Sequence, residues 1–313
     1  MQIGYIGLGR MGKNMVLHLL EQGIEVVAWN RSPQPAEELK SQNSKVKIAK
    51  SIENLVSELE SPRIIWLMLP AGQTTDEFIN TLLPLLNKGD LLIDGANSFY
   101  KDTLKRAEKI KPTGVHFMDI GVSGGPGGAR SGACLMIGGE KEDFQRIEPL
   151  AKAAAAEGAY QHLGPIGAGH FAKMVHNGIE YGMMEAIGEG LAILKNSSFQ
   201  YDFDKLLDIY NHRSVIESRL VGWAQNAFKE DPNLDNTSSK IGSGGAGAQR
   251  IPGEADWTVG VAKELGIDTP VIEDAIKIRE NSASVEENSP NGFRNKVVSA
   301  LRGQFGQHAV KKQ

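Results

Sequence analysis

Short apolar runs alternate with helical patterns through the first half of the chain. In the helical segments, apolar residues recur at intervals of three and four, as on one face of an amphipathic helix. Strands and helices in alternation predict a mostly parallel, doubly wound sheet. The predicted strands are Gln2–Ile6, Glu25–Trp29, Val46–Ile48, Arg63–Leu69, Asp90–Asp94, Val115–Ile120 and Leu135–Ile137, and the predicted helices are Arg10–Gln22, Pro35–Ser41, Ile52–Glu60, Thr74–Leu86, Phe99–Ile110 and Glu142–Ala156.

The pattern changes near residue 165, where clustered glycines precede a helical pattern that continues to about Lys195. No convincing strand follows, so we expect an α/β chain: a Rossmann-type doubly wound domain over residues 1–166, followed by an all-α domain over residues 167–313. The Gly- and Ser-rich stretch Ser238–Gly253 is predicted to be a loop. The later predicted helices are Asp204–Asn211, Ile216–Phe228, Asp256–Leu265, Val271–Asn281 and Phe293–Leu301.

Composition narrows the classes of function. The 313 residues include 34 Lys or Arg and 38 Asp or Glu, for a net charge of −4, which gives no positive patch for nucleic acid or an anionic membrane. No apolar run is long enough to span a bilayer, and we expect a cytoplasmic protein. Cys134 is the only cysteine, which excludes an internal disulfide and a zinc site built on paired cysteines. The histidines are scattered, so no metal site is predicted.

A Gly-rich turn joins the first predicted strand to the first predicted helix. Its sequence is Gly7-Leu8-Gly9-Arg10-Met11-Gly12. In this pattern the first glycine permits a tight turn, the second lets a pyrophosphate approach the backbone, and the third packs the helix on the strand. The position of the turn predicts a dinucleotide site. The alternative is a tight turn with a purely structural role.

The residues after the second predicted strand indicate which dinucleotide binds. An acidic residue there would accept the ribose 2′-hydroxyl of NAD, but the chain has Asn30, Arg31 and Ser32. Since a cation would pair with a 2′-phosphate, NADP is favoured over NAD. In the alternative, Arg31 is a solvated surface charge and Asn30 holds the ribose.

The long helix after residue 167 begins with a polar stripe. Lys173, Asn177 and Glu180 fall on one face at helical spacing, with His176 at its edge. A lysine whose pKa is lowered toward neutrality by burial or a neighbouring cation can act as a general base, and a carboxylate can return a proton. Lys173 and Glu180 are therefore candidate catalytic residues. The alternative is a solvated lysine–glutamate pair of small energetic weight.

A set of motifs extends these observations along nearly the whole chain: G-L-G-R-M-G at 7–12, N-R-S at 30–32, M-L-P-A-G at 68–72, I-D-G-A-N-S at 93–98, G-V-S-G-G-P-G-G-A-R-S-G at 121–132, L-M-I-G-G at 135–139 and G-H-F-A-K-M-V-H-N-G-I-E-Y-G at 169–182. Together they resemble the 6-phosphogluconate dehydrogenases of the β-hydroxyacid dehydrogenase superfamily, in their short form. The segment K-M-V-H-N-G-I-E-Y is the most specific of these motifs.

The resemblance implies oxidative decarboxylation of 6-phospho-D-gluconate to ribulose 5-phosphate and CO2, with NADP or NAD, in the pentose phosphate pathway or in gluconate utilization. It makes Lys173 the general base and Glu180 the acid. It implies a homodimer or tetramer in which the C-terminal tail reaches the neighbouring subunit's site. The residues it assigns to the sugar acid and its phosphate are Asn97, Ser123, Gly124, Gly125, His176, Asn177, Tyr181, Arg279, Arg302 and His308, and those it assigns to the nicotinamide side are Met68, Leu69, Pro70 and Asn97.

One position departs from the family pattern, so substrates other than 6-phosphogluconate remain as alternatives. Asp256 precedes Trp257 where relatives carry a basic residue, and Arg250 or Lys240 would then have to serve the phosphate. The alternatives are a dehydrogenase of another β-hydroxy acid, either 3-hydroxyisobutyrate-like or a non-phosphorylated or sulfonated aldonic acid, and a non-catalytic nucleotide sensor. The presence of Lys173 and Glu180 argues against the sensor.

The segment Gly121–Gly125 also has the letters of a hydrolase nucleophile elbow, G-x-S-x-G. An elbow needs a strand, a sharp turn and then a helix. We expect no helix in the glycine run after Ser123, which argues against a hydrolase.

Overall fold

The computed structural model describes residues 1–241 and 253–306. The chain divides into two compact units, which are Met1–Met174 and Val175–Gln313. The predicted loop Ser238–Gly253 lies largely outside the described residues. None of the described helices is both long enough and apolar enough to cross a membrane.

The first unit is built on an eight-stranded sheet with the strand order β3-β2-β1-β4-β5-β6-β7-β8. All neighbouring strands are parallel except β6 and β7, which are antiparallel. The order reverses between β1 and β4, and the crevice beyond the carboxyl ends of such strands is where open α/β sheets bind ligands. The strands are β1 (Gln2–Ile6), β2 (Glu25–Trp29), β3 (Lys47–Ile48), β4 (Ile64–Leu67), β5 (Leu91–Asp94), β6 (His116–Ser123), β7 (Ala133–Gly138) and β8 (Ala155–Gly164).

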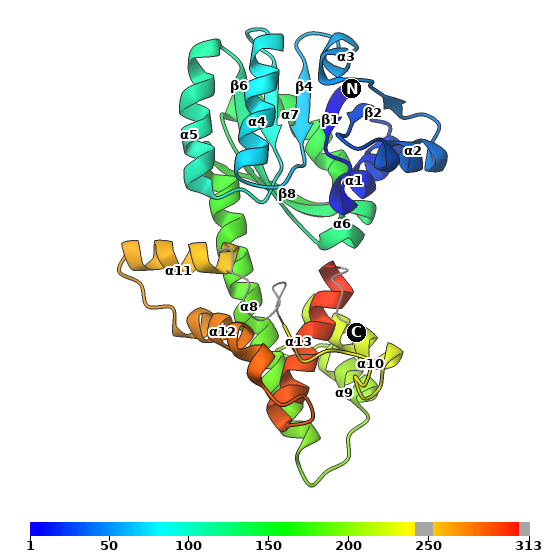
Figure 1. The fold of residues 1–313 in the computed structure, drawn as a ribbon, viewed down its shortest axis with the longest axis vertical. Helices are drawn as coiled ribbons and strands as arrows, with labels where there is room; N and C mark the ends of the chain where they lie inside the picture. The colour runs from blue at the N-terminus through cyan, green and yellow to red at the C-terminus, as the bar shows by residue number, and fades with distance from the viewer. Residues whose placement is uncertain (242–252, 307–313) are drawn as a thin grey trace. The chain divides into compact units, whose positions relative to one another are not determined.

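Helices cover both faces of this sheet because side chains alternate along each strand. Ile3 and Tyr5 of β1 belong to one core cluster, whereas Ile6 belongs to another. The first cluster includes α1, α6 and α7, and the second includes α3, α4 and α5, which Figure 1 shows on their respective faces. The helices are α1 (Arg10–Glu21), α2 (Pro33–Gln42), α3 (Ile52–Ser57), α4 (Gln73–Leu82), α5 (Tyr100–Ile110), α6 (Gly125–Ser131) and α7 (Lys141–Ala154).

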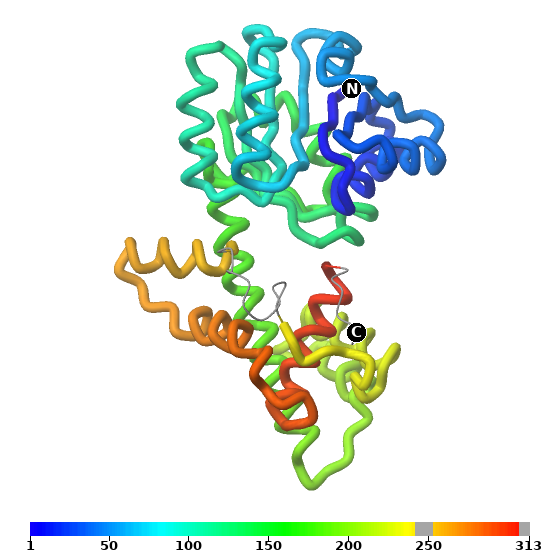
Figure 2. The backbone as a smooth tube through the Cα atoms, in the orientation of Figure 1, coloured from blue at the N-terminus to red at the C-terminus, as the bar shows by residue number. Residues whose placement is uncertain are grey.

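The elements of the second unit are helices, and their path can be followed in Figure 2. Its core gathers three aromatic rings, Phe203, Phe228 and Phe293, with centroid separations between 4.9 and 6.3 Å. Helix α8 (Ala168–Lys195) begins in the first unit and continues into the second. The others are α9 (Phe203–Tyr210), α10 (Arg219–Glu230), α11 (Glu254–Glu264), α12 (Pro270–Asn281) and α13 (Pro290–Gly306). The predicted fold class, a Rossmann-type sheet followed by a helical domain, is confirmed.

Two elements of the first unit contradict the sequence prediction. Strand β8 was not predicted, since its segment has few large apolar residues and no buried position; it forms through parallel pairing with β7 at the sheet edge. Helix α6 begins at Gly125, one residue after Gly124, so the expectation of no helix in the glycine run after Ser123 was wrong. Gly124, at φ +114°, provides the turn, and α6 packs on α1. The described residues with left-handed φ other than glycine do not include Ser123, so the strained serine of a nucleophile elbow is absent.

Candidate active site

The Gly-rich turn after β1 has the shape of a pyrophosphate cradle. A Cβ on Gly7, which has φ +104°, would lie 2.2 Å from the Met68 carbonyl oxygen, and one on Gly12 would lie 1.9 Å from the Gly7 carbonyl oxygen. These two glycines are therefore required by the fold itself. A Cβ on Gly9 would meet nothing within 4 Å, so the second glycine leaves open space where a phosphate would approach the first turn of α1.

Asn30 ties this turn to the end of β2. The Leu8 backbone N–H donates to Asn30 Oδ1 at 2.8 Å, and Asn30 Nδ2 donates to the Ser32 carbonyl at 2.9 Å. Asn30 thus stabilises the turn through its side-chain hydrogen bonds. The side chains of Arg31 and Ser32 are exposed beside it and are accessible to a ligand.

Two further loops leave the carboxyl ends of β4 and β5. The first contains Met68, Leu69 and Pro70, and the Pro70 carbonyl accepts a hydrogen bond from Thr75 Oγ1 at 3.0 Å. In the second, Asn97 is exposed between Ala96 and Ser98, which are 2% and 3% exposed. Both loops therefore end at the sheet edge that the dinucleotide turn occupies.

The end of β6 lies directly against the first part of α8. A Cβ on Gly121 would be 2.4 Å from Cβ of Lys173, so no larger residue fits at that position. Lys173 is buried, with 6% exposure. Ser123 ends β6, and Gly124 and Gly125 both have positive φ. Gly121 thus allows the backbone of β6 to approach the candidate base.

Asp119, which the sequence analysis missed, holds the start of α8. Its Oδ1 accepts the Gly167 N–H at 2.7 Å and its Oδ2 accepts the His170 N–H at 2.6 Å. Burial raises the pKa of Asp119, while the charge of His170 and these N–H groups act in the opposite direction. The available signal was a carboxylate inside an otherwise apolar strand. Asp119 fixes the helix turn from which Lys173 projects.

The continuation of α8 in the second unit carries His176, Asn177 and Glu180. His176 Nδ1 lies 2.9 Å from Asn177 Oδ1 and 3.8 Å from Glu180 Oε2. The Glu180 side chain is 20% exposed, which leaves it access to solvent or a ligand. His176 thus contacts two members of the predicted polar stripe, Asn177 and Glu180.

Two arginines gather near the same helix. The Arg279 guanidinium carbon lies 3.3 Å from the Tyr181 ring centroid, and Arg279 Nε donates to Glu185 Oε1 at 3.3 Å. Arg302 Nη1 donates to the Ile241 carbonyl at 3.0 Å. Burial and then the charge of Arg279 lower the pKa of Arg302, with Tyr181 and Glu180 opposing this. Two guanidinium groups that disfavour each other are suited to an anion between them.

Some of the remaining predicted site residues lie outside the described residues, and another has a structural role. His308 and Arg250 lie outside the described residues. Asp256 does not need a phosphate-related role, because its Oδ2 accepts the Gly253 N–H at 2.8 Å and so caps the first turn of α11. Within residues 1–241 and 253–306, no group of three or more His, Cys, Asp or Glu side chains is placed to hold a metal ion.

Family models match almost the entire chain. The NAD binding domain of 6-phosphogluconate dehydrogenase matches residues 2–164, and the 6-phosphogluconate dehydrogenase C-terminal domain matches residues 169–312. The glycines of the turn after β1 fit the dinucleotide that the first of these domains binds.

Several proteins are similar to this chain over most of its length. A Bacillus subtilis (strain 168) protein named "Putative 6-phosphogluconate dehydrogenase YqeC" is 41% identical over 100% of both chains. The NAD(+)-dependent decarboxylating 6-phosphogluconate dehydrogenase of Haloferax volcanii is 34% identical over 99% of this chain and 98% of its own. The NADP(+)-dependent decarboxylating enzyme of Bacillus subtilis is 39% identical over 91% of this chain and 62% of its own, so this chain matches less than two thirds of that enzyme's length.

Two solved structures are similar to this chain over most of its length. The Plasmodium falciparum 6-phosphogluconate dehydrogenase superposes with a TM-score of 0.78 at 31% identity, over 96% of this chain and 70% of that chain. A Mycobacterium tuberculosis 3-hydroxyisobutyrate dehydrogenase, with a TM-score of 0.72 and 21% identity over 96% and 99%, shares the fold. The chain is an oxidoreductase with a nicotinamide dinucleotide-binding domain, and it belongs to the 6-phosphogluconate dehydrogenase family.

Proposed function

We propose that the protein is a decarboxylating 6-phosphogluconate dehydrogenase that converts 6-phospho-D-gluconate to ribulose 5-phosphate and CO2. The observation that carries the proposal is the pair of partly buried arginines near Tyr181, Arg279 and Arg302. A phosphate dianion would relieve the repulsion between two such cations, whereas an uncharged substrate end would not. His308 is proposed as a further ligand, supplied by the tail.

The catalytic roles follow from the residues of α8. A bound nicotinamide supplies the acceptor for the hydride that leaves carbon 3. Lys173, in its neutral form, takes the proton of the carbon-3 hydroxyl, which gives a 3-keto acid. The protonated lysine then stabilises the enolate oxygen that develops as CO2 departs, and Glu180 protonates carbon 1 of the enediol. The sugar acid is held by Asn97, Ser123, Gly124, Gly125, His176 and Asn177.

We propose NADP as the preferred cofactor, with NAD as the alternative. The Arg31→Ala variant should raise the KM for NADP by about 10- to 100-fold, because a charge-assisted hydrogen bond of about 1.5–3 kcal/mol to the 2′-phosphate is lost. The KM for NAD should change little. Initial rates with each cofactor measure this, with Lys45→Ala as the control at another exposed cation. Equal changes for the two cofactors would show that Arg31 does not contact the 2′-phosphate.

A rate panel tests the function directly. NAD and NADP are each combined with 6-phosphogluconate, gluconate and 3-hydroxyisobutyrate, and both reduced cofactor and released CO2 are followed. We expect the highest kcat/KM for 6-phosphogluconate with NADP, and equal amounts of the two products. Preference for 3-hydroxyisobutyrate, or cofactor reduction without CO2, would contradict the proposal. A non-phosphorylated or sulfonated aldonic acid would be indicated if gluconate matched or exceeded 6-phosphogluconate.

We further propose that the protein is at least a homodimer assembled through its second unit. Large apolar side chains there are highly exposed, among them Ile193 at 72%, Phe199 at 68% and Val271 at 67%. Apolar exposure of this extent is typical of a surface that a second copy covers. Sedimentation velocity at micromolar concentration should give a dimer or tetramer, and a monomer would refute this.

A further inference from the structure

We propose that Arg106 is a positioning residue of the reaction: its guanidinium joins the loop after β4 to the loop after β5 and so fixes Asn97 relative to Met68–Pro70. The inference rests on the proposed function in assigning those two loops to substrate and nicotinamide.

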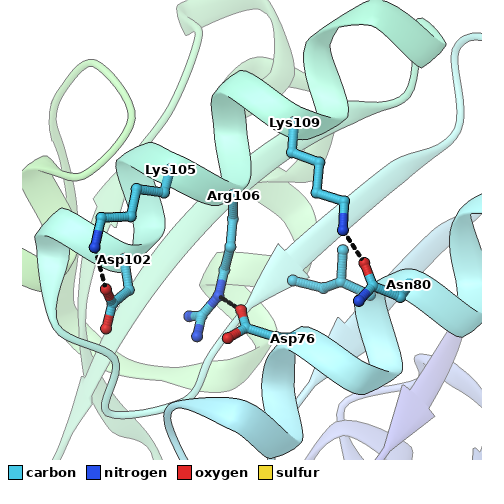
Figure 3. Close-up of a pocket in the computed structure, with 7 residues that line it drawn as sticks. Asp76, Asn80, Asp102, Lys105, Arg106 and Lys109 are labelled. Atoms are coloured by element: carbon cyan, nitrogen blue, oxygen red, sulfur yellow. Dashed lines mark hydrogen bonds and ion pairs between the residues drawn. The ribbon is translucent and has the colours of Figure 1, made fainter.

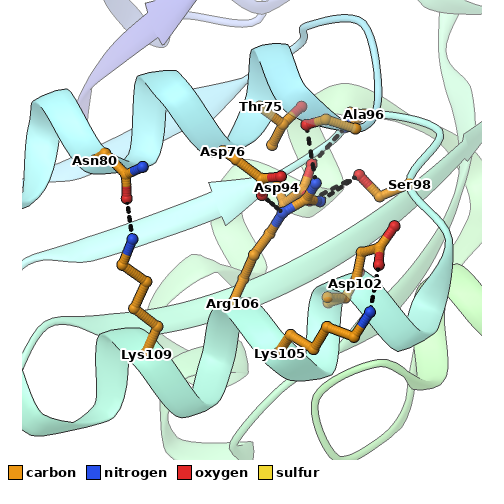
Figure 4. Close-up of polar contacts among 12 residues, drawn as sticks. Thr75, Asp76, Asn80, Asp94, Ala96, Ser98, Asp102, Lys105, Arg106 and Lys109 are labelled. Carbon is orange, nitrogen blue, oxygen red and sulfur yellow. Dashed lines mark hydrogen bonds and ion pairs between the residues drawn. The ribbon is translucent and has the colours of Figure 1, made fainter.

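Figure 4 shows the contacts of Arg106 with Asp76 at the start of α4 and with Asp94 and Ser98 at and after the end of β5. On the β5 side, Nη1 donates to Asp94 Oδ2 at 2.9 Å and to Ser98 Oγ at 2.8 Å. On the β4 side, Nη2 donates to the Gly72 carbonyl at 3.2 Å and Nε donates to Asp76 Oδ1 at 2.6 Å. A single planar group therefore holds two loops that share no chain segment.

Burial makes this connection strong. Arg106 is 5% exposed and Asp94 is fully buried. A buried carboxylate requires a paired charge and hydrogen bonds, because water is not available to solvate it. Charge-assisted hydrogen bonds in such a setting are short and directional. The guanidinium thus sets the position of Asp94 rather than merely neutralising it.

Asp94 in turn shapes the loop that carries Asn97. Its Oδ1 accepts the Ala96 N–H at 3.0 Å, and its Oδ2 accepts the Ser98 hydroxyl at 2.9 Å. These bonds fix the residues on both sides of Asn97, whose own side chain is exposed. The orientation of Asn97 therefore depends on Arg106 through one intermediate carboxylate.

The other end of the bridge reaches the loop after β4. Gly72 ends that loop at φ +84° and precedes the first residue of α4. Within the same turn, Thr75 donates to the Pro70 carbonyl. An ammonium group cannot replace this bridge, because a lysine has one nitrogen and lacks the planar fork that reaches acceptors on two sides.

A shallow hollow of about 170 Å³ lies on the outer side of Arg106, between α4 and α5 (Figure 3). Asp76 and Asn80 line it from α4, and Asp102, Lys105 and Lys109 line it from α5. Lys109 donates to Asn80 there. The hollow gives a small cation a route from solvent to the space that a truncated Arg106 would leave.

The test compares Arg106→Lys and Arg106→Ala with the control Lys109→Ala, which removes another cation that links α5 to α4. Arg106→Lys keeps a charge beside Asp94 but loses part of the bridge, so we expect its unfolding midpoint to fall less than that of Arg106→Ala. The kcat of Arg106→Lys should fall by about 10- to 100-fold, because a small misplacement of the groups that hold the substrate has effects of this size. NADP should still bind, since the Gly7–Gly12 turn does not contact Arg106, but its affinity should fall because the loop that contains Met68–Pro70 lines the nicotinamide side. Lys109→Ala should keep full kcat.

Chemical rescue separates positioning from general stability. Millimolar guanidinium should restore part of the kcat of Arg106→Ala, whereas sodium at equal ionic strength should not. Full kcat in Arg106→Lys, or a loss of kcat matched by an equal loss in Lys109→Ala, would overturn the proposal. The variants are assayed with whichever acid of the rate panel the unmodified protein oxidises, so a wrong substrate assignment would appear in the unmodified protein and not in this comparison.

Discussion

Replacing Lys173 by Met should lower kcat by about 10²- to 10⁴-fold, the usual contribution of a general acid–base group, while NADP still binds. Methionine has a similar length and fills the buried space beside Gly121 without a proton-accepting nitrogen. The fold should therefore persist. Stopped-flow and steady-state measurements of cofactor reduction with 6-phosphogluconate would give the rate, and equilibrium titration with NADP would give the affinity.

The control for this variant lies on the same helix. Lys195 ends α8, is exposed, and has its ammonium 5.7 Å from the Phe293 ring centroid. Lys195→Met should leave kcat unchanged, since it removes a lysine from α8 without touching the candidate base. A Lys173→Met protein with the unmodified rate would exclude the proposed proton transfer. A variant that no longer binds NADP would show instead that Lys173 supports the structure of the first unit.

The sequence was most informative where a local pattern determines the structure. The spans predicted for β1 and β2 are the observed ones, and β4, β5 and most helices differ only at their ends, because alternation and helical spacing are properties of the segment itself. Strand β8 and helix α6 escaped prediction for the opposite reason. Each is stabilised by a neighbour, β7 in one case and α1 in the other, and a segment's own pattern does not report such partners.

The same distinction applies to the site. The glycine turn and the polar stripe of α8 are consecutive or helically spaced motifs, and they were predicted. Asp119 and Arg106 form hydrogen bonds with segments that are distant in the sequence, and they were missed. For Arg106 a signal was present, since Thr103, Arg106 and Ile110 form the buried stripe of α5 at intervals of three and four. A charged residue in such a stripe needs a buried partner, and Asp94, inside an apolar run on the preceding strand, was the candidate.

The Arg302→Gln variant tests the substrate class most sharply. Removing a partly buried charge that contacts a phosphate costs about 2–5 kcal/mol, so the KM for 6-phosphogluconate should rise by about 30- to 5000-fold. Arg302 is the better choice than Arg279, because Arg279 pairs with the buried Glu185, whose pKa burial already raises and whose charge would be left uncompensated. By contrast, Arg302 has the repelling charge of Arg279 beside it, and glutamine keeps a donor for the Ile241 carbonyl, so the unfolding midpoint should fall only slightly.

A non-phosphorylated substrate distinguishes phosphate binding from a general defect. The weak rate with gluconate should be the same in Arg302→Gln and in the unmodified protein, because gluconate has no group for the arginine to bind. Arg219→Gln, which removes an exposed guanidinium stacked on Trp223 at 5.2 Å, should change neither rate. An unaltered KM for 6-phosphogluconate in Arg302→Gln would show that Arg302 does not bind the phosphate. An equal loss with both acids would mean that Arg302 supports the second unit, and the pairing of partly buried arginines would then have to be explained by folding alone.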